Sequence, residues 1–446
     1  MLKKIMGILM AVCIVFTVAA CGGDGSGSGE NGESVSDSNA KWKNLTDASQ
    51  ITFDNKTLVY MGNEGTEDWL QKAINKFSDM GGSVEWINAV WDQRQQQLAT
   101  RVTTQDSPDL YKYQPNAGDW PNVILKGQVQ EVESLIDYNS PLLKHLMPLY
   151  NSLKVSGKAY MMPINIYPFR SLVYYNKKIF EDNGLETPHQ LFLKNQWTME
   201  KMMQYAKELT SIKDGNTESF GMYCIDEGPF VAATGKDFVD YDANGKLINT
   251  IMDPAISKAM ERVRQMFYSD KSLTFDVNTA RDMMIKGKVA MWVGPAWESD
   301  SFKILTNAGS VEFVPFPKDP DADKWYIDAS FNAEFLPKGA KNPDAAAAWV
   351  VNYAQMNNDP AYIKEENTTF ATQRKMPAEF GDLYHSMVSS DKFVPVFLKN
   401  RNLLDFYTKF QTEFWDSLMA GESWSAIAER LSPAINDEIR KFDAFK

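Results

Sequence analysis

The chain has 446 residues, of which 44% are hydrophobic, and its formal net charge at pH 7 is −12. This acidic balance argues against a nucleic-acid-binding surface and against a polybasic face that would hold the protein on a membrane. The whole chain has three cysteines and three histidines, so a zinc site of clustered Cys and His is not expected. We expect neither a metal ion nor a cofactor.

Residues 1–20 have the features of a secretion signal. Two lysines precede an apolar run at 5–18, which is shorter than the ~20 residues of an ordinary membrane span. The ending "VAAC" resembles the bacterial lipobox, and this resemblance implies that the chain is cut before Cys21 and that a lipid is attached to its thiol. The alternatives are a plain signal peptide that happens to contain a cysteine and an uncleaved anchor.

Residues 21–49 are expected to form a flexible, lipid-anchored linker. From Gly22 to Asn39 the chain consists of Gly, Ser, Asn and acidic residues, with Val35 as the one apolar side chain. Such a segment cannot bury enough surface to fold, and Gly/Ser-rich chain behaves as a flexible coil. We therefore predict a folded body outside the cytoplasm, attached to the cell membrane through the lipid on Cys21 alone.

Strands and helices then alternate along the chain. Apolar residues at helical or strand spacing, with glycines at the ends, predict strands at 56–62, 83–90 and 107–113 and helices at 66–82 and 91–105. This β-α-β-α-β order indicates a mostly parallel sheet with helices on both faces. The same alternation resumes at 170–226, and long helices are expected at 253–269, 343–355 and 410–442. Some 400 residues are too many for one ordinary core, so we expect two lobes.

Two segments are assigned to structure rather than to chemistry. Asp240–Lys246 resembles the start of an EF-hand calcium loop, but the position that requires a bidentate Glu is Ile251, so a hairpin turn at Asn244-Gly245 is predicted. Cys224 lies in an apolar strand context and is expected to be a buried packing residue rather than a nucleophile.

Several aromatic residues follow the predicted ends of strands, where ligands of open α/β sheets bind. A flat ring can stack on the C–H face of a sugar while carboxylates and amides bind its hydroxyls. For each ring taken alone, packing in the core of a lobe is the alternative. The predicted ligand-binding residues are Trp297, Tyr167, Phe169, Trp120 and Trp69, with Glu64, Asp119 and Asp328 as hydroxyl partners.

The motifs of common hydrolases do not accompany these residues. The sequence has no G-x-S-x-G and no H-E-x-x-H, and its 58 acidic residues make chance carboxylate pairs certain, so pairing alone does not nominate a glycosidase. We therefore expect a binding protein with no catalytic residues.

Several segments, in this order, resemble the extracellular solute-binding proteins of ABC importers, in the carbohydrate-binding group that includes maltose-binding protein. The resemblance runs from about Lys56 to the C-terminus. The segments that carry it are "SPDLYKY", "GKAYMMPINIYPFRSLVYYNKKIFEDNGLETP", "MIKGKVAMWVGPAW" and "NAEFLPKGAKNPDAAAAWVVNYA".

The resemblance implies a two-lobe α/β fold of the type II periplasmic-binding-protein kind, with a mostly parallel sheet in each lobe and a ligand cleft between the lobes. The expected lobes are 50–163 plus 282–328 and 166–280 plus 331–446, with crossings near 163–166, 276–282 and 328–332.

The function that the resemblance implies is capture of a sugar or oligosaccharide and its delivery, by a monomeric protein, to a membrane permease. The alternatives are a non-sugar ligand, such as a peptide or polar metabolite, and a lipid-anchored polysaccharide hydrolase.

Overall fold

The computed structural model describes residues 39–62, 68–115, 117–242 and 245–445. The predicted signal segment and Cys21 lie outside these residues, and so does Glu64. Within the described ranges, no helix combines the length and the apolar character that crossing a bilayer requires.

The first of two six-stranded sheets is built around a parallel core. Its strands are, in spatial order, β14 (Phe393–Val396), β13 (Trp325–Phe335), β3 (Leu110–Lys112), β1 (Thr57–Gly62) and β2 (Ser83–Asn88), with β4 (Met161–Pro168) paired to β13. β1 is parallel to β2 and β3, whereas β13 is antiparallel to β3 and β4. The β-α-β order predicted for this part of the chain is confirmed.

The second sheet is mixed as well. Its strands are β10 (Leu273–Thr274), β7 (Asn216–Cys224), β11 (Val289–Gly294), β5 (Leu172–Asn176) and β12 (Val311–Pro315), with β6 (Ser211–Lys213) paired to β7. β7 is parallel to β10 and β11, and β5 is antiparallel to β11 and β12. Cys224 is buried in this sheet, as predicted.

Helices cover both sheets. The longer ones are α1 (Asp68–Asp79), α2 (Arg94–Thr103), α7 (Met199–Glu208), α9 (Pro254–Arg264), α10 (Val277–Ile285), α12 (Pro343–Asn358), α13 (Pro360–Gln373), α14 (Glu379–Ser389), α15 (Leu404–Met419) and α16 (Trp424–Ala444). Asp253 begins α9 as expected, because its carboxylate accepts the backbone N–H of Ala255 (2.8 Å) and a proline follows it.

Shorter elements connect these parts. The short helices are α3 (Asp119–Leu125), α4 (Met147–Ser152), α5 (Lys177–Asp182), α6 (Pro188–Leu193), α8 (Gly228–Ala233) and α11 (Lys303–Asn307). The 3₁₀ helices are η1 (Ala48–Gln50), η2 (Trp91–Gln93), η3 (Lys144–Leu146), η5 (Ala296–Phe302) and η6 (Asn400–Asn402), and η4 (Gln265–Ser269) is a short π-helix. The strands of the hairpin expected around residues 240–246 are β8 (Val239–Tyr241) and β9 (Leu247–Asn249), which pair antiparallel, while Asn244 of the predicted turn lies outside the described residues.

The C-terminal part of the predicted linker is folded, which corrects the expected start of the body at residue 50. Leu45 and Ala48 are buried in the core of the first sheet. The indole N–H of Trp42 donates to the carboxylate of Asp344 (3.1 Å) at the start of α12. These few apolar residues hold the end of the predicted linker on the first sheet, although its polar composition predicted an unstructured segment.

Strand pairing also corrects the expected lobes. Residues 282–328 were assigned to the first lobe, but β11 lies between β5 and β7 and β12 pairs with β5, so both strands belong to the second sheet. The expected crossing near 276–282 is absent, because β10 and β11 on either side of it share that sheet. Every residue of β11 is buried, which suits a central strand.

The helix α12, expected in the second lobe, packs on the first sheet. Its alanines 345–348 are fully buried and let it approach the strands closely. The ring of Trp349 packs against Tyr60 of β1 (centroids 5.6 Å apart) and against Phe77 of α1 (5.5 Å).

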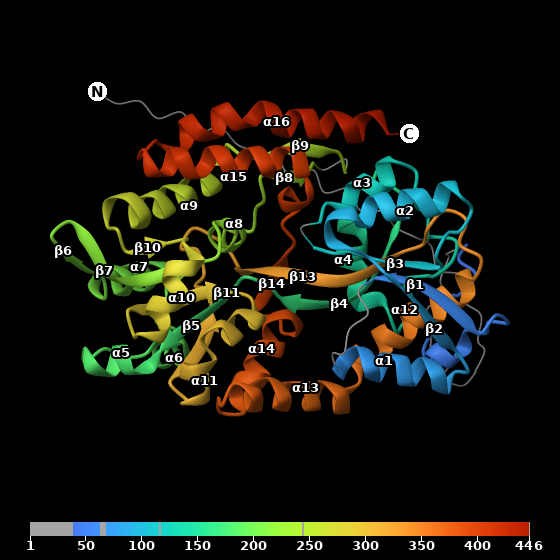
Figure 1. The fold of residues 1–446 in the computed structure, drawn as a ribbon, viewed down its shortest axis with the longest axis horizontal. Coiled ribbons are helices and arrows are strands. Elements are labelled where there is room, and N and C mark those ends of the chain that lie inside the picture. Colours follow the sequence, from blue (N-terminus) through green and yellow to red (C-terminus); the bar gives the residue numbers. More distant parts are fainter. Residues whose placement is uncertain (1–38, 63–67, 116, 243–244, 446) are drawn as a thin grey trace, which may run out of the picture. The chain divides into compact units, whose positions relative to one another are not determined.

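The chain passes between the sheets along β4 and β13, which we call the crossing strands (Figure 1). One end of β13 pairs with β3 in the first sheet. At its other end, the backbone N–H of Asp328 donates to Ser171 Oγ (2.6 Å), directly before β5 of the second sheet. β4 and β13 contain the residues of the crossings expected near 163–166 and 328–332.

Candidate ligand-binding groove

One face of the crossing strands carries polar side chains. Successive side chains of a strand alternate between its faces, and the register pairs Tyr167 with Ser330 and Asn165 with Asn332. These four residues therefore share a face.

A groove of about 470 Å³ lies over this face. Small-molecule sites usually measure ~300–1,000 Å³, so the groove has the size of a ligand site. Its walls come from the crossing strands, the first turn of α1, the end of α12, and α13 and α14. The side chains that line it include Trp69, Asn165, Tyr167, Asn332, Tyr353, Asn357, Tyr362, Glu366, Asn367, Phe370, Gln373, Arg374, Tyr384 and His385.

Aromatic rings in the groove are held in stacked pairs. Trp69 of α1 and Tyr353 of α12 are nearly parallel, with an interplanar angle of 3° and centroids 5.4 Å apart. Phe370 of α13 and Tyr384 of α14 stack at 4.3 Å. One pair thus comes from helices of the first sheet, and the other from the two helices that follow α12. Rings fixed by their neighbours offer flat apolar surfaces at little cost in side-chain entropy.

A chain of amides crosses the floor of the groove. Asn332 Nδ2 donates to Asn165 Oδ1, and Asn165 Nδ2 donates to Asn357 Oδ1, both at 2.8 Å. Asn357 Nδ2 donates in turn to the backbone carbonyl of Tyr353 (2.8 Å). Each amide group has two donors and two acceptor lone pairs, so these side chains are oriented and still have capacity to bind hydroxyl groups.

The charged side chains of the groove are largely engaged by the protein. Arg374 Nε donates to Ser299 Oγ (3.0 Å), Arg374 Nη2 donates to the carbonyl of Ala296 (3.1 Å), and the guanidinium lies 4.1 Å from the ring centroid of Phe370. Glu366 accepts from Lys72 Nζ at 3.4 Å. Burial lowers the pKa of His385, which favours its neutral form. The groove therefore presents rings and dipoles, which suit a neutral polar ligand.

The structure brings two predicted residues, Trp69 and Tyr167, together in this groove. Phe169 and Asp328 lie instead in a buried charged cluster. The guanidinium group of Arg170 lies 4.8 Å from the ring centroid of Phe169, and that of Arg401 lies 5.7 Å from it. The carboxylate of Asp328 is fully buried and is bound by Arg401, so we leave Asp328 out of the proposed groove.

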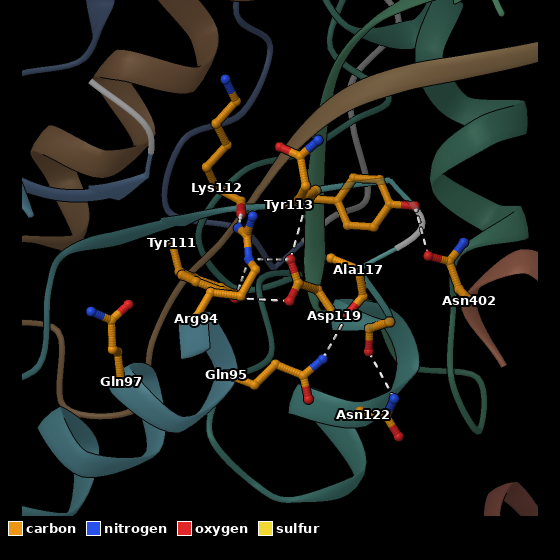
Figure 2. A network of polar contacts seen from close by, with 12 residues as sticks. Arg94, Gln95, Gln97, Tyr111, Lys112, Tyr113, Ala117, Asp119, Asn122 and Asn402 are labelled. Carbon is orange, nitrogen blue, oxygen red and sulfur yellow. Dashed lines mark hydrogen bonds and ion pairs between the residues drawn. The ribbon is translucent and has the colours of Figure 1, made fainter. Parts of the chain in front are cut away.

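Two more predicted residues, Trp120 and Asp119, are core residues of the first half. Trp120 is 2% exposed, and its indole N–H donates to the carbonyl of Leu153 (3.1 Å). Figure 2 shows Asp119 enclosed by Arg94, whose Nε lies 3.1 Å from Asp119 Oδ2, and by Tyr111, whose hydroxyl donates to Asp119 Oδ1 (2.8 Å). Burial raises the pKa of Asp119, and the adjacent Arg94 opposes this shift. Neither side chain lines the groove over the crossing strands.

Trp297 is 57% exposed, so it is not a core residue. It follows β11 directly, as expected, but it is not among the described residues that line the groove. Its neighbour Ala296 is bound by Arg374, which does line the groove, and this contact brings the two regions close together.

Sequence reasoning missed most of the groove. Tyr353, Phe370 and Tyr384 lie on helices, where an aromatic residue at helical spacing is ordinarily a core residue. The amides of Asn165 and Asn332 stand inside strands that otherwise read as apolar. A polar stripe on α13, with Glu366 and Gln373 seven residues apart on one helical face, is the one local signal that could have pointed to a lined surface.

Comparison with known proteins fits this architecture. Residues 63–355 match the model of the family described as bacterial extracellular solute-binding protein. This match spans well over half of the chain, and the chain belongs to this family. The family resemblance expected from the sequence is confirmed.

Several known proteins are similar to this chain over most of its length. The diacetylchitobiose-binding protein DasA of Streptomyces coelicolor is 22% identical over 326 residues, which cover 69% of this chain and 67% of DasA. A Listeria monocytogenes ABC substrate-binding protein in complex with cycloalternan superposes with a TM-score of 0.61 at 17% identity, covering 88% of this chain and all of that one. The maltodextrin-binding domain of Bdellovibrio bacteriovorus, bound to maltotriose, gives 0.57 at 16% identity, covering 86% and 100%. The fold is that of the type II periplasmic binding proteins.

Proposed function

We propose that this protein is the substrate-binding component of an ABC importer, and that it captures a sugar or oligosaccharide in the groove over the crossing strands. The observation that carries the proposal is the lining of the groove, in which stacked aromatic pairs and a chain of amides share one surface. Family membership supports it, and so do the saccharides named for the relatives.

The chemistry of the groove suits a polyhydroxylated ring. The apolar C–H face of a sugar can lie on Trp69 or Tyr384, while its hydroxyl groups exchange hydrogen bonds with Asn165, Asn332 and Asn367. Because Arg374 and Glu366 are engaged by protein groups, a neutral ligand leaves no buried charge unpaired. Binding of this kind breaks no covalent bond and requires no nucleophile.

Capture works through a shift between arrangements of the two sheets. The walls of the groove come from helices that pack on the first sheet and from α13 and α14, which follow α12 in the chain. A ligand that contacts both sets of walls favours the arrangement in which they are close. The loaded protein then docks on the membrane permease. Trp297, exposed beside the groove, is our candidate for a contact with the ligand or with this partner.

The lipid anchor belongs to this proposal. Cys21 and the polar residues after it would hold the folded body near the permease, and such a tether raises the effective concentration of the binding protein at its partner.

The proposal is tested by a thermal-shift screen of the full chain. Maltotriose, diacetylchitobiose, cycloalternan and a wider saccharide panel are compared with a panel of short peptides. A saccharide present at 100 times its dissociation constant should stabilise the protein by ~2.7 kcal/mol. Stabilisation by peptides and by no saccharide would contradict the proposal, and so would release of hydrolysis products from an oligosaccharide.

A further inference from the structure

The wall that α12 contributes to the groove is braced from behind. The last turn of this helix carries Tyr353 and Asn357 in the groove, and Gln355 of the same turn is bound by residues 40–51, which we call the strap. We propose that Gln355 is a positioning residue, through which the strap fixes this turn, so that strap docking and ligand binding stabilise each other. The inference rests on the proposed function for its ligand, but its first test needs none.

The strap is paired with the body through its backbone. The N–H of Trp42 donates to the carbonyl of Leu135 (3.0 Å), and the carbonyl of Trp42 accepts the N–H of Asp137 (2.9 Å). Further along, the carbonyl of Leu45 accepts the N–H of Leu142 (3.0 Å). Because backbone groups are strong hydrogen-bonding groups, pairing at both points gives the strap a defined path across the body.

One clasp joins the strap to the start of α12. Lys41 Nζ lies 2.7 Å from both carboxylate oxygens of Asp344, and the indole N–H of Trp42 donates to the same carboxylate. Asp344 lies in the first turn of the helix, roughly two and a half turns before Tyr353. This clasp therefore holds the strap at a distance from the groove.

A second clasp joins the strap to the end of α12. Gln355 Oε1 accepts the backbone N–H of Ala48 (2.7 Å), and Gln355 Nε2 donates to Asp47 Oδ2 (2.8 Å). The carboxylate of Asp47 is itself held, because its Oδ1 accepts the N–H of Ser49 (2.9 Å) at the start of η1. Both ends of the amide are thus bonded to the strap, which fixes the orientation of the Gln355 side chain.

Helix geometry places this second clasp behind the groove. Successive residues of an α-helix are about 100° apart around its axis, so residues two positions apart lie on nearly opposite sides. Tyr353 and Asn357 are four positions apart and share one side, which lines the groove. Gln355 stands between them on the other side, where it meets the strap.

From the groove side, the same turn is held by groups that a ligand would itself contact. Trp69 stacks on Tyr353, and Asn165 Nδ2 donates to Asn357 Oδ1 (2.8 Å). A saccharide that binds this ring and these amides competes with their contacts to the helix. The Gln355 clasp takes no part in that competition, because no residue of the strap is among the described residues that line the groove.

Strap docking and ligand binding are therefore linked. A ligand that favours this position of the turn also favours the docked strap, and the docked strap raises the affinity for the ligand by the same factor. In the sequence, the strap directly follows the polar segment expected to tether the protein. The coupling joins the base of that tether to the groove.

Hydrogen exchange of the ligand-free, full-length protein tests the positioning. Gln355→Ala should speed exchange over 353–357 and over the strap by roughly 2- to 12-fold, the factor that corresponds to about one hydrogen bond. The effect is no larger because Trp69, Asn165 and His145 keep their contacts with the end of α12. Alanine is a better helix former than glutamine, so faster exchange in this variant cannot come from helix propensity.

Calorimetric titration tests the coupling to the ligand. The probes are the saccharides of the thermal-shift screen, maltotriose, diacetylchitobiose and cycloalternan among them. Each saccharide that binds the parent protein should bind Gln355→Ala more weakly, by a factor similar to that seen in exchange. The same saccharide should slow exchange over the strap in the parent and slow it less in the variant, because the coupling is reciprocal.

The matched control is Asp344→Ala, which opens the other clasp of the strap on the same helix. It should speed exchange over 41–43, while exchange over 353–357 and saccharide affinity stay as in the parent. If Gln355→Ala does not fold, Gln355→Met keeps the length of the side chain, loses both hydrogen bonds and should give the same result.

Parent-like exchange over 353–357 in the Gln355 variant would overturn the inference, and so would an equal acceleration there in Asp344→Ala. Unchanged affinity of the Gln355 variant for a saccharide that binds the parent would also overturn it, and would leave the proposed function standing. If no saccharide of the screen binds the parent, the proposed function fails, and the exchange data alone decide whether Gln355 positions the turn.

Discussion

Glu334 is a buried carboxyl group in the core of the first sheet, hydrogen-bonded to the hydroxyl of Tyr60. Burial raises its pKa from 4.5 to about 8, and Tyr60 and Lys112 offset this only in part. Between these two values the folded protein keeps a proton that the unfolded chain releases. The free energy of unfolding should therefore fall as pH rises from 4.5 to 8, by up to ~1.4 kcal/mol per pH unit from this group.

Glu334→Gln removes this titration and keeps an acceptor for Tyr60. Relative to the parent protein, the variant should gain stability steadily between pH 5 and pH 8, as measured by urea unfolding at several pH values. Glu131→Gln, a change at an exposed carboxylate bound by Lys158, is the matched control and should show no such trend. A constant difference between Glu334→Gln and the parent across this range would show that Glu334 is ionised in the folded state.

Single positions also show where sequence reasoning stops. Asp119 and Asp328 were predicted as ligand contacts because both stand near the end of a predicted strand or a crossing. Their partners, Arg94 and Arg401, lie 25 and 73 residues away in the sequence. An ion pair between residues so far apart cannot be predicted from a local sequence pattern. Trp69 and Tyr167 were predicted by the same rule and do line the groove, where Trp69 stacks on Tyr353.

At the scale of elements, the walls of the groove depend on how closely α13 and α14 approach each other. A Cβ added at Gly381 of α14 would lie 2.0 Å from the backbone oxygen of Asn367 on α13. Gly381→Ala should push the two helices apart, at a cost of ~1–3 kcal/mol in unfolding free energy. Saccharide affinity should fall with it, because Asn367 and Tyr384 move although neither is changed.

Gly221→Ala separates this effect from general destabilisation. The added Cβ would lie 1.8 Å from the backbone oxygen of Ala206, where α7 packs on β7, and neither residue lines the groove. This variant should lose stability to a similar extent while its saccharide affinity stays close to that of the parent. Equal affinity losses in the two variants, measured by calorimetry below both melting temperatures, would argue against α13 and α14 as walls of the site.

The elements themselves were largely predictable, because strand and helix periods are local properties of the sequence. Their assignment to sheets was not. β11 is an apolar strand that could serve either sheet, and its place between β5 and β7 is decided by partners distant in the chain. α12 was likewise assigned to the wrong lobe, because an alanine-rich helix surface can pack closely on either sheet. Pairing order, rather than element type, is what the sequence left open.

At the scale of the whole molecule, the N-terminus predicts where the protein works. If Cys21 is lipidated, Cys21→Ala should abolish incorporation of a fatty-acid probe in cells and release the protein from the membrane fraction. Cys224→Ala is the control, since this buried thiol should leave labelling unchanged. Equal labelling of the parent and of Cys21→Ala would refute the anchor and leave the groove and its ligand untouched.

The central claim is that a saccharide binds in the groove over the crossing strands. Calorimetric titration of the full chain with the best saccharide of the screen, repeated with Trp69→Ala and Trp91→Ala, tests it most directly. Trp91 is 50% exposed and does not line the groove, so it controls for the loss of an accessible indole. Loss of a stacking ring costs roughly 1–3 kcal/mol in nucleic-acid complexes, and on that scale Trp69→Ala should weaken binding ~5- to 150-fold. Trp91→Ala should bind like the parent, and unchanged affinity in Trp69→Ala would contradict the claim.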